Sequence, residues 1–171
     1  EVLRDQGYAT AGFVANRYWC GRGFGLDRGF QYYDDQLRVT PEAILTSWRI
    51  TKTTQEAVRS TLGNHQVVLR KSASSVNASL LRWIDRRRTP FFAFVNLYDA
   101  HEPYIPPDNF GFPFATGIPR AHWDDRKAET FSESELSQMR AAYDSSIYYL
   151  DHQLGVLLTE LRRRGVLDNT I

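Results

Sequence analysis

Residues Thr89 to Pro107 read TPFFAFVNLYDAHEPYIPP and decide the fold, because an apolar run ends abruptly in a loop with titratable side chains. Residues 91–95 are aromatic or β-branched and lack clean alternation, which is typical of a parallel strand covered on both faces. In open α/β sheets ligands bind beyond the carboxyl ends of strands, so the polar loop is a candidate site. A proline-rich surface connection with solvated side chains is the alternative.

A helix is expected directly before this strand, over residues 72–88. Its serines supply a cap, and its apolar residues recur at three-to-four spacing. These apolar residues are Val76, Leu80, Leu81 and Ile84. Helix, short turn and strand in this order predict an α/β fold, mainly a parallel sheet flanked by helices.

The first 35 residues continue the alternation of helix and strand. Residues 1–6 read as the end of a helix closed by Gly7, and a strand is expected over about residues 8–15. Residues 16–35 are rich in glycine and aromatic residues, which predicts an ordered loop packed through its aromatic side chains. A helix is expected from Pro41 to about Ile50, because proline is favoured at the first helical position. Residues 110–129 are expected to form a long loop.

The strongest helical pattern begins at Ser132, which forms a capping box with Glu135. One apolar stripe is expected to be buried, and Gly165 ends the helix. The stripe comprises Leu136, Met139, Tyr143, Ile147, Leu150, Leu154, Leu157 and Leu161. Gly155 inside the helix costs about 1 kcal/mol relative to alanine, which predicts close packing against a neighbour. Residues 167–171 read as the start of a strand.

The amino-acid composition indicates one globular domain with a small net charge. The chain has 171 residues, is 42% hydrophobic and 24% charged, and carries a formal net charge of +1. This balance gives no global attraction to nucleic acid, so we expect no nucleic-acid partner. No apolar run approaches the roughly 20 residues that span a bilayer. The single cysteine, Cys20, excludes an internal disulfide framework and a multi-cysteine zinc site.

Three segments, taken together and in order, resemble the sulfatase family. Residues 90–107 are similar to its strand and loop of the form P-F-F-x-F-x-x-x-x-D-x-H-x-P-Y-x-P-P. Residues 7–13 resemble its G-Y-x-T strand, and residues 25–30 resemble the later G-x-x-x-G-F turn. Residues 143–169 resemble its long helix with D-x-x-x-G. The resemblance implies that residues 1–171 form a single partial α/β domain of the sulfatase and alkaline-phosphatase-like fold. The domain is expected to be an internal segment truncated at both ends.

The resemblance also implies roles for three residues. His101 occupies the motif position whose imidazole contacts the sulfate ester near its leaving-group oxygen, so it is the candidate catalytic residue. An imidazole can donate to a sulfate oxygen or protonate a departing alkoxide near neutral pH. Asn16 and Arg17 follow the first strand, where many sulfatases carry a lysine and a histidine on the sulfate, and are the candidate substrate-binding residues. Asn16 as a turn former is the alternative.

The nucleophile and metal motifs of the family are missing from the sequence. Sulfatases use a formylglycine made in the pattern C/S-x-P/A-x-R, whereas Cys20 is followed by Gly-Arg-Gly-Phe and is expected to be a small packed or partly exposed thiol. The family member implied by the resemblance binds Ca²⁺, but we assign no metal ligand to this chain. The carboxylates of Asp99 and Glu102 supply too few oxygen ligands for a hard cation such as Ca²⁺. Asp99 is expected to fix its loop through backbone hydrogen bonds.

The sequence is therefore interpreted as a segment of a sulfatase that hydrolyses small-molecule or glycan sulfate esters. The isolated chain is expected to be inactive, because nucleophile and metal ligands are missing together. Two alternatives stay open. The parent enzyme is a phosphonate or phosphodiester hydrolase of the same superfamily, or the chain is a non-catalytic relic that binds anions or a partner.

Overall fold

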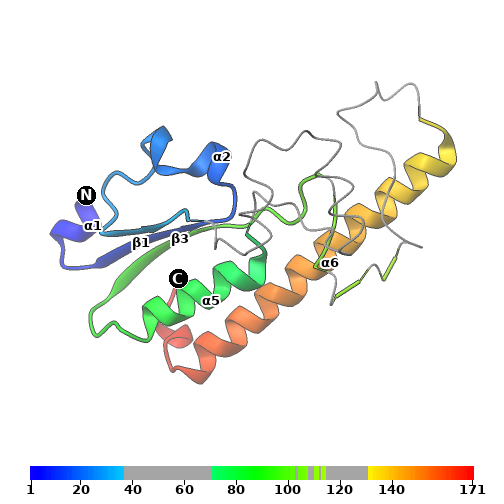
Figure 1. Cartoon of the computed structure of the whole chain (residues 1–171). Coiled ribbons are helices and arrows are strands. Elements are labelled where there is room, and N and C mark those ends of the chain that lie inside the picture. Colours follow the sequence, from blue (N-terminus) through cyan, green and yellow to red (C-terminus); the bar gives the residue numbers. More distant parts are fainter. Residues whose placement is uncertain (37–70, 103, 108–109, 112, 115–130) are drawn as a thin grey trace. The chain divides into compact units, whose positions relative to one another are not determined.

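A computed structural model describes residues 1–36, 71–102, 104–107, 110–111, 113–114 and 131–171 (Figure 1). The chain divides into two compact units, each of which is described by itself. Unit 1 comprises Glu1–Gln36, Leu69–Asp99 and Tyr148–Ile171, and unit 2 comprises Leu37–Val68 and Ala100–Ile147. The helix expected at residues 41–50 and most of the loop over residues 110–129 lie outside the described residues.

Unit 1 contains a parallel sheet with the strand order β2-β1-β3. Its strands are β1 (Ala9–Val14), β2 (Tyr32–Asp34) and β3 (Phe91–Asn96), and Ala11 of β1 pairs with Tyr32 and Ala93. The short helix α1 (Val2–Asp5) precedes β1, and Gly7 between them has φ +85°, as a left-handed helix end requires. The parallel α/β prediction is confirmed.

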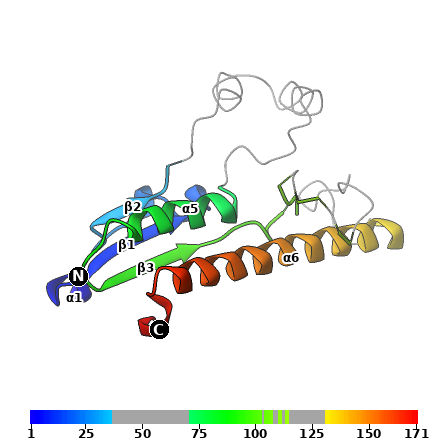
Figure 2. The same cartoon turned by 90° about the horizontal axis from the view of Figure 1, so that it is seen from below.

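Two helices cover one face of this sheet (Figures 1 and 2). They are α5 (Ala73–Ile84) and the end of α6 (Glu133–Arg163). The shared core is built from alternate residues of β1 and from the inward residues of both helices. These are Ala9, Ala11, Phe13, Ala15, Val76, Leu80, Trp83, Ile84, Leu157 and Leu161. The predicted helix before β3 is therefore confirmed, with Ser72 as its cap and an earlier end, at Ile84.

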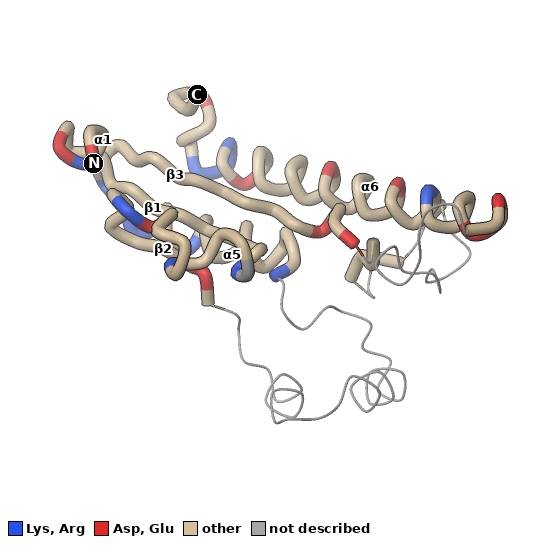
Figure 3. Tube along the Cα trace, turned by 90° about the horizontal axis from the view of Figure 1, so that it is seen from above, with Lys and Arg blue, Asp and Glu red and all other residues tan. Residues whose placement is uncertain are grey.

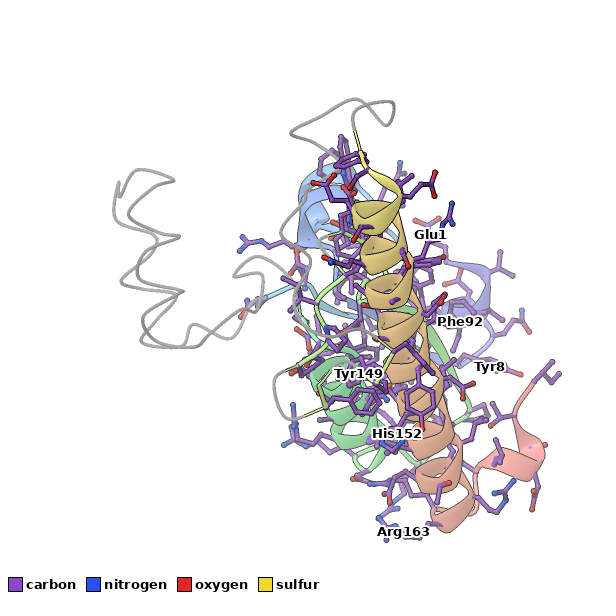
Figure 4. The ribbon with its side chains drawn as sticks, turned by 90° about the vertical axis from the view of Figure 1, so that its right-hand side faces the viewer. Glu1, Tyr8, Phe92, Tyr149, His152 and Arg163 are labelled. Carbon is purple, nitrogen blue, oxygen red and sulfur yellow. The ribbon has the colours of Figure 1, made fainter. Side chains whose placement is uncertain are left out.

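The opposite face of β3 is open. Phe92 and Phe94 are 42% and 39% exposed, and Figure 4 shows Phe92 with Tyr8 on the side of the sheet away from α5. The expectation that both faces of this strand are covered is wrong for this chain. Among the described residues, β3 lies at one end of the strand order, and its outward face is partly covered by the Phe30 ring, which stacks on Phe92 with centroids 6.0 Å apart.

Residues 16–35 contain regular structure that the sequence did not indicate. They form helix α2 (Arg17–Cys20), 3-10 helix η1 (Arg22–Phe24) and then β2. The expectation that this segment packs through its aromatic side chains is wrong for two of them. Trp19 and Phe24 are 61% and 58% exposed, and their rings contact each other. Elements of three or four residues are too short to give a periodic sequence pattern.

Gly12 allows the segment after β1 to lie close to the sheet. A Cβ atom at Gly12 would stand 2.4 Å from the ring of Tyr33, which is buried. The Tyr33 hydroxyl donates a 2.7 Å hydrogen bond to the carbonyl oxygen of Cys20, so the ring is held in place. The glycine of the Thr-Ala-Gly-Phe sequence in β1 is thus explained by close approach of a side chain.

The start of α6 follows the prediction, but its buried face does not. Ser132 and Glu135 form the capping box, with the Ser132 N–H donating to Glu135 Oε2 at 2.8 Å. Tyr143, Ile147 and Leu154 of the predicted stripe are 42%, 42% and 45% exposed. The buried residues are Met139, Ala142, Ser145, Ser146, Tyr149, Leu157 and Leu161.

Polar contacts with α5 explain this rotation of the helix within unit 1. The Tyr149 hydroxyl accepts a 3.2 Å hydrogen bond from the Ser74 N–H, and Asn77 Nδ2 donates to the Gln153 carbonyl oxygen at 2.9 Å. Figure 4 shows Tyr149 on the side of α6 that faces α5. A hydropathy pattern ranks tyrosine and glutamine below leucine, so it selects the neighbouring face.

The end of the chain is a 3-10 helix, η4 (Leu167–Asn169), in place of the predicted start of a strand. The basic residues before it lie at the carboxyl end of α6 (Figure 3). Arg164 bonds Asp85 at 2.7 Å, which lowers the pKa of that carboxyl, and hydrogen bonds from Arg163 and Arg164 lower the pKa of Glu160. The basic residues of the last turn thus lie where cations complement the helix dipole.

Replacing Gly155 with alanine is expected to raise the free energy of unfolding by about 1 kcal/mol. Gly155 is exposed, and a Cβ atom there would meet nothing within 4 Å, so the predicted close packing is wrong. Urea denaturation of the natural protein measures the change. Gly12→Ala is the matched control and is expected to destabilise, because its Cβ would overlap Tyr33. Destabilisation by Gly155→Ala would contradict this description of α6.

Candidate functional site

The carboxyl edge of the sheet gathers polar side chains from all three strands. Asn16 lies two residues after the end of β1, Asp34 ends β2 and Asn96 ends β3. The backbone N–H of Asn16 donates to Asn96 Oδ1 at 3.1 Å, which links the first and third of these residues. This edge is where parallel α/β sheets bind ligands.

Lys71 ties two strand ends to the start of α5. Its Nζ donates to Asp34 Oδ1 at 2.6 Å and to the Asp34 carbonyl oxygen at 2.8 Å, and its N–H donates to the Ala15 carbonyl oxygen at 3.4 Å. The two side chains are 7% and 15% exposed. A charge pair this shielded from water needs its hydrogen bonds to offset desolvation, and both direct bonds are present.

Asp99 also holds the start of α5. It is 1% exposed, and its Oδ1 accepts a 3.2 Å hydrogen bond from the N–H of Ala73, the first residue of α5. A carboxylate at this position also interacts favourably with the helix dipole. The predicted backbone hydrogen bonding of Asp99 is confirmed, although its partner lies 26 residues away rather than within the loop.

Asn16 and Arg17 lie where β1 gives way to α2. Asn16 is 8% exposed and caps α2, its Oδ1 accepting a 3.1 Å hydrogen bond from the N–H of Trp19. This is the turn-forming role that stood as the alternative for Asn16. Arg17 is exposed at the first position of α2. Their contact with a substrate stays a prediction.

Arg22 holds the segment between α2 and β2. Its N–H donates to Asp35 Oδ2 at 3.0 Å, its Nη2 donates to the Tyr33 carbonyl oxygen at 2.6 Å, and its guanidinium lies 3.7 Å from Asp27. Burial raises the pKa of Tyr33, and the charges of Cys20, Asp35 and Asp27 add to this while Arg22 opposes it. The phenol therefore stays neutral at physiological pH.

His101 belongs to unit 2, in the loop after β3. It is exposed, and its Nδ1 lies 3.1 Å from the carbonyl oxygen of Glu102. Because a carbonyl oxygen only accepts, this hydrogen bond requires Nδ1 to carry the proton. The structure thus brings Asn16 together with Asn96 in unit 1, and His101 together with Glu102 in unit 2.

The described residues include no group of three histidine, cysteine, aspartate or glutamate side chains that could hold a metal ion. Cys20 is a free, partly buried cysteine at the end of α2. Within the described part of the chain, no helix has the length and apolar character needed to cross a bilayer. No residue described here is therefore assigned to a metal.

Comparison with known families decides the identity of the domain. The profile of the Sulfatase family matches residues 1–171. The chain belongs to the sulfatase family. This confirms the resemblance drawn from the three sequence segments. A comparison with curated proteins gives no match.

A solved structure with a TM-score above 0.5 shows the same fold. A phosphonate monoester hydrolase of Agrobacterium radiobacter aligns with a TM-score of 0.55 at 18% identity, over 97% of this chain and 44% of that one. The lipoteichoic acid synthase LtaP from Listeria monocytogenes aligns with a TM-score of 0.47 at 16% identity, over 96% of this chain and 32% of that one. This sulfatase-family chain spans less than half the length of either structure.

Sequence reasoning missed Lys71 and Asp34. They are 37 positions apart, and each follows or precedes a region with no firm pattern, so no local signal joined them. The Asp34-Asp35 pair at the end of an aromatic run was the only visible cue.

Proposed function

We propose that this chain is part of an enzyme that hydrolyses sulfate esters, with His101 as the catalytic residue that assists departure of the alcohol. The observation that carries the proposal is the sequence Asp-Ala-His-Glu-Pro-Tyr, which directly follows β3 in a chain matched over residues 1–171 by the Sulfatase family. Titratable groups beyond the end of a parallel strand are in the right place to meet a ligand.

The hydrogen bond of His101 supports a specific role for its ring. With Nδ1 donating to the Glu102 carbonyl oxygen, the ring orientation is set and the second nitrogen, Nε2, is assigned to the ester. In this role the ring is an imidazolium with a proton on each nitrogen. Nε2–H donates first to the ester oxygen, and it transfers its proton as a nucleophile bonds to sulfur and the bond between sulfur and that oxygen breaks, which leaves a neutral imidazole that keeps the Nδ1 proton. The alcohol leaves neutral rather than as an alkoxide.

From the family resemblance, Asn16 and Arg17 are proposed to contact the charged oxygens of a sulfate ester. Arg17 is exposed and offers a fork of guanidinium donors suited to a tetrahedral anion. Asn16 Oδ1 accepts a hydrogen bond as a helix cap, and Nδ2, the donor of this side chain, is the atom proposed to contact the anion. The two residues are adjacent and lie at the carboxyl edge of the sheet.

The metal and the nucleophile of the family are not assigned to described residues. Sulfatases generally use a metal ion, with Ca²⁺ implied for this enzyme by the sequence resemblance, but no described cluster fits one. Cys20 lies in the sequence Cys-Gly-Arg-Gly-Phe, which does not fit the formylglycine pattern. The proposed steps therefore involve only His101, Asn16 and Arg17.

A phosphonate or phosphodiester hydrolase is the second candidate, because its substrates are also tetrahedral anions. A phosphonate monoester hydrolase shares the fold of this chain. The test compares 4-nitrophenyl sulfate, 4-nitrophenyl phenylphosphonate and bis(4-nitrophenyl) phosphate as substrates of the natural protein, in the presence of Ca²⁺. We expect the highest kcat/KM for the sulfate, by about 10-fold or more. A higher value for the phosphonate or the diester would favour the second candidate, and no turnover of any of them would favour the non-catalytic alternative.

A further inference from the structure

Tyr104 has an unusual backbone conformation close to His101. Among the described residues it is the only one other than glycine with a positive φ, at +56°. This region is disfavoured by the Cβ atom, and for a bulky side chain it is an outlier. Such conformations persist only where their surroundings hold them, and they cluster at functional sites.

Two contacts within unit 2 hold Tyr104 in this conformation. Its ring packs edge-on against Tyr143 of α6, with centroids 5.2 Å apart and planes at 68°. Its N–H donates a 3.2 Å hydrogen bond to the carbonyl oxygen of His101. Burial, assisted by Glu102 and Tyr143, raises the pKa of the Tyr104 phenol, so the ring packs as a neutral group.

The same four-residue stretch also orients the imidazole. His101 Nδ1 bonds the carbonyl oxygen of Glu102, while the carbonyl oxygen of His101 itself accepts from Tyr104. The direction of the Glu102 carbonyl depends on the conformation of the backbone from His101 to Tyr104. A change in conformation at Tyr104 therefore reorients the acceptor that fixes the His101 ring.

The geometry points to Tyr104 as a positioning residue: packed against Tyr143, it holds the His101–Glu102 hydrogen bond and thereby keeps the imidazole oriented toward the leaving-group oxygen. This inference rests on the proposed function of His101. It assigns no contact between Tyr104 and the substrate. The ring and the left-handed backbone are both required, and the hydroxyl is not.

Three variants of the natural protein separate these features. Tyr104→Phe keeps the ring, Tyr104→Gly accepts the positive φ without the ring, and Tyr143→Ala removes the surface against which the ring packs. Ile147→Ala is the matched control, because Ile147 lies one turn further along α6 and is 42% exposed, as is Tyr143. The readouts are kcat and KM for an alkyl sulfate and for 4-nitrophenyl sulfate.

We expect Tyr104→Phe and Ile147→Ala to stay within about 2-fold of the parent kcat, and Tyr104→Gly and Tyr143→Ala to lose about 10-fold with little change in KM. The loss is expected to be larger for the alkyl sulfate, as for a change at His101 itself, and to vanish in a His101→Ala background. Equal losses for both substrates, or a loss in Tyr104→Phe, would overturn the inference. A parent protein without sulfate turnover would instead remove the proposed function.

Discussion

Replacing His101 with alanine in the natural protein is expected to lower kcat for a sulfate ester by about 10²-fold or more, since general acid assistance typically contributes 10² to 10⁴. His101 is exposed in its loop and makes its ring hydrogen bond to the neighbouring residue, so the fold is expected to survive the change. Steady-state kinetics measure the loss, and circular dichroism confirms that the variant is folded.

The loss is expected to depend on the leaving group. An alkyl alkoxide is a poor leaving group and needs the proton, whereas 4-nitrophenolate departs without one. His101→Ala is therefore expected to affect alkyl sulfates more than 4-nitrophenyl sulfate. His152→Ala is the matched control, because His152 is an exposed histidine of α6 outside the proposed site. Equal losses for both substrates would mean that His101 binds sulfate without protonating the alcohol, and no loss would remove it from the site.

Breaking the Asp34–Lys71 pair is expected to lower the free energy of unfolding by about 3 kcal/mol. In Asp34→Ala the ammonium of Lys71 stays 7% exposed and loses its carboxylate partner at 2.6 Å. The cost arises from leaving a shielded charge unpaired rather than from losing attraction alone. Urea denaturation, monitored by tryptophan fluorescence, measures the change.

Two further variants test this explanation of the Asp34–Lys71 pair. Asp5→Ala removes the exposed pair with Arg4, whose side chains are 46% and 62% exposed, and is expected to change stability by less than about 1 kcal/mol. Adding Lys71→Met to Asp34→Ala removes the stranded charge and is expected to recover part of the loss. If the double variant is no more stable than Asp34→Ala, the loss comes from packing and the electrostatic account is wrong.

The elements predicted correctly are those with strong local signals. The helix ending at Ile84 and the strand Phe91–Asn96 are long enough to show periodicity and composition. The capping box at Ser132 needs only residues three positions apart, and it forms as expected. Gly7 ends its helix for an equally local reason.

The features that the sequence did not indicate depend on distant partners. The buried face of α6 includes Tyr149, whose hydroxyl accepts a hydrogen bond from Ser74, 75 positions away. Asp99 was expected to form hydrogen bonds with the backbone, but the sequence of its loop does not identify the N–H group at the start of α5 as the partner. The positive φ of Tyr104 depends on its ring contact with Tyr143.

The candidate site also contains residues with a local sequence signal and residues that only the fold identifies. His101 was selected from its motif, because a single exposed histidine has no periodic or compositional signal of its own. Asn16 was selected from its place after β1, and the structure adds that its Oδ1 serves as a helix cap. Lys71 and Asp34 required the fold, because only the sheet brings β2 next to the start of α5.

Crystals of the natural protein soaked in selenate, the selenium analogue of sulfate, test most directly whether the loop after β3 binds the sulfate end of the substrate. The soak uses a concentration at which selenate inhibits turnover, and the anomalous signal of selenium locates the ion. We predict a selenate oxygen at hydrogen-bond distance, about 3 Å, from a ring nitrogen of His101. An ordered selenate elsewhere on the protein, with none at His101, would contradict the assignment of this loop to the active site.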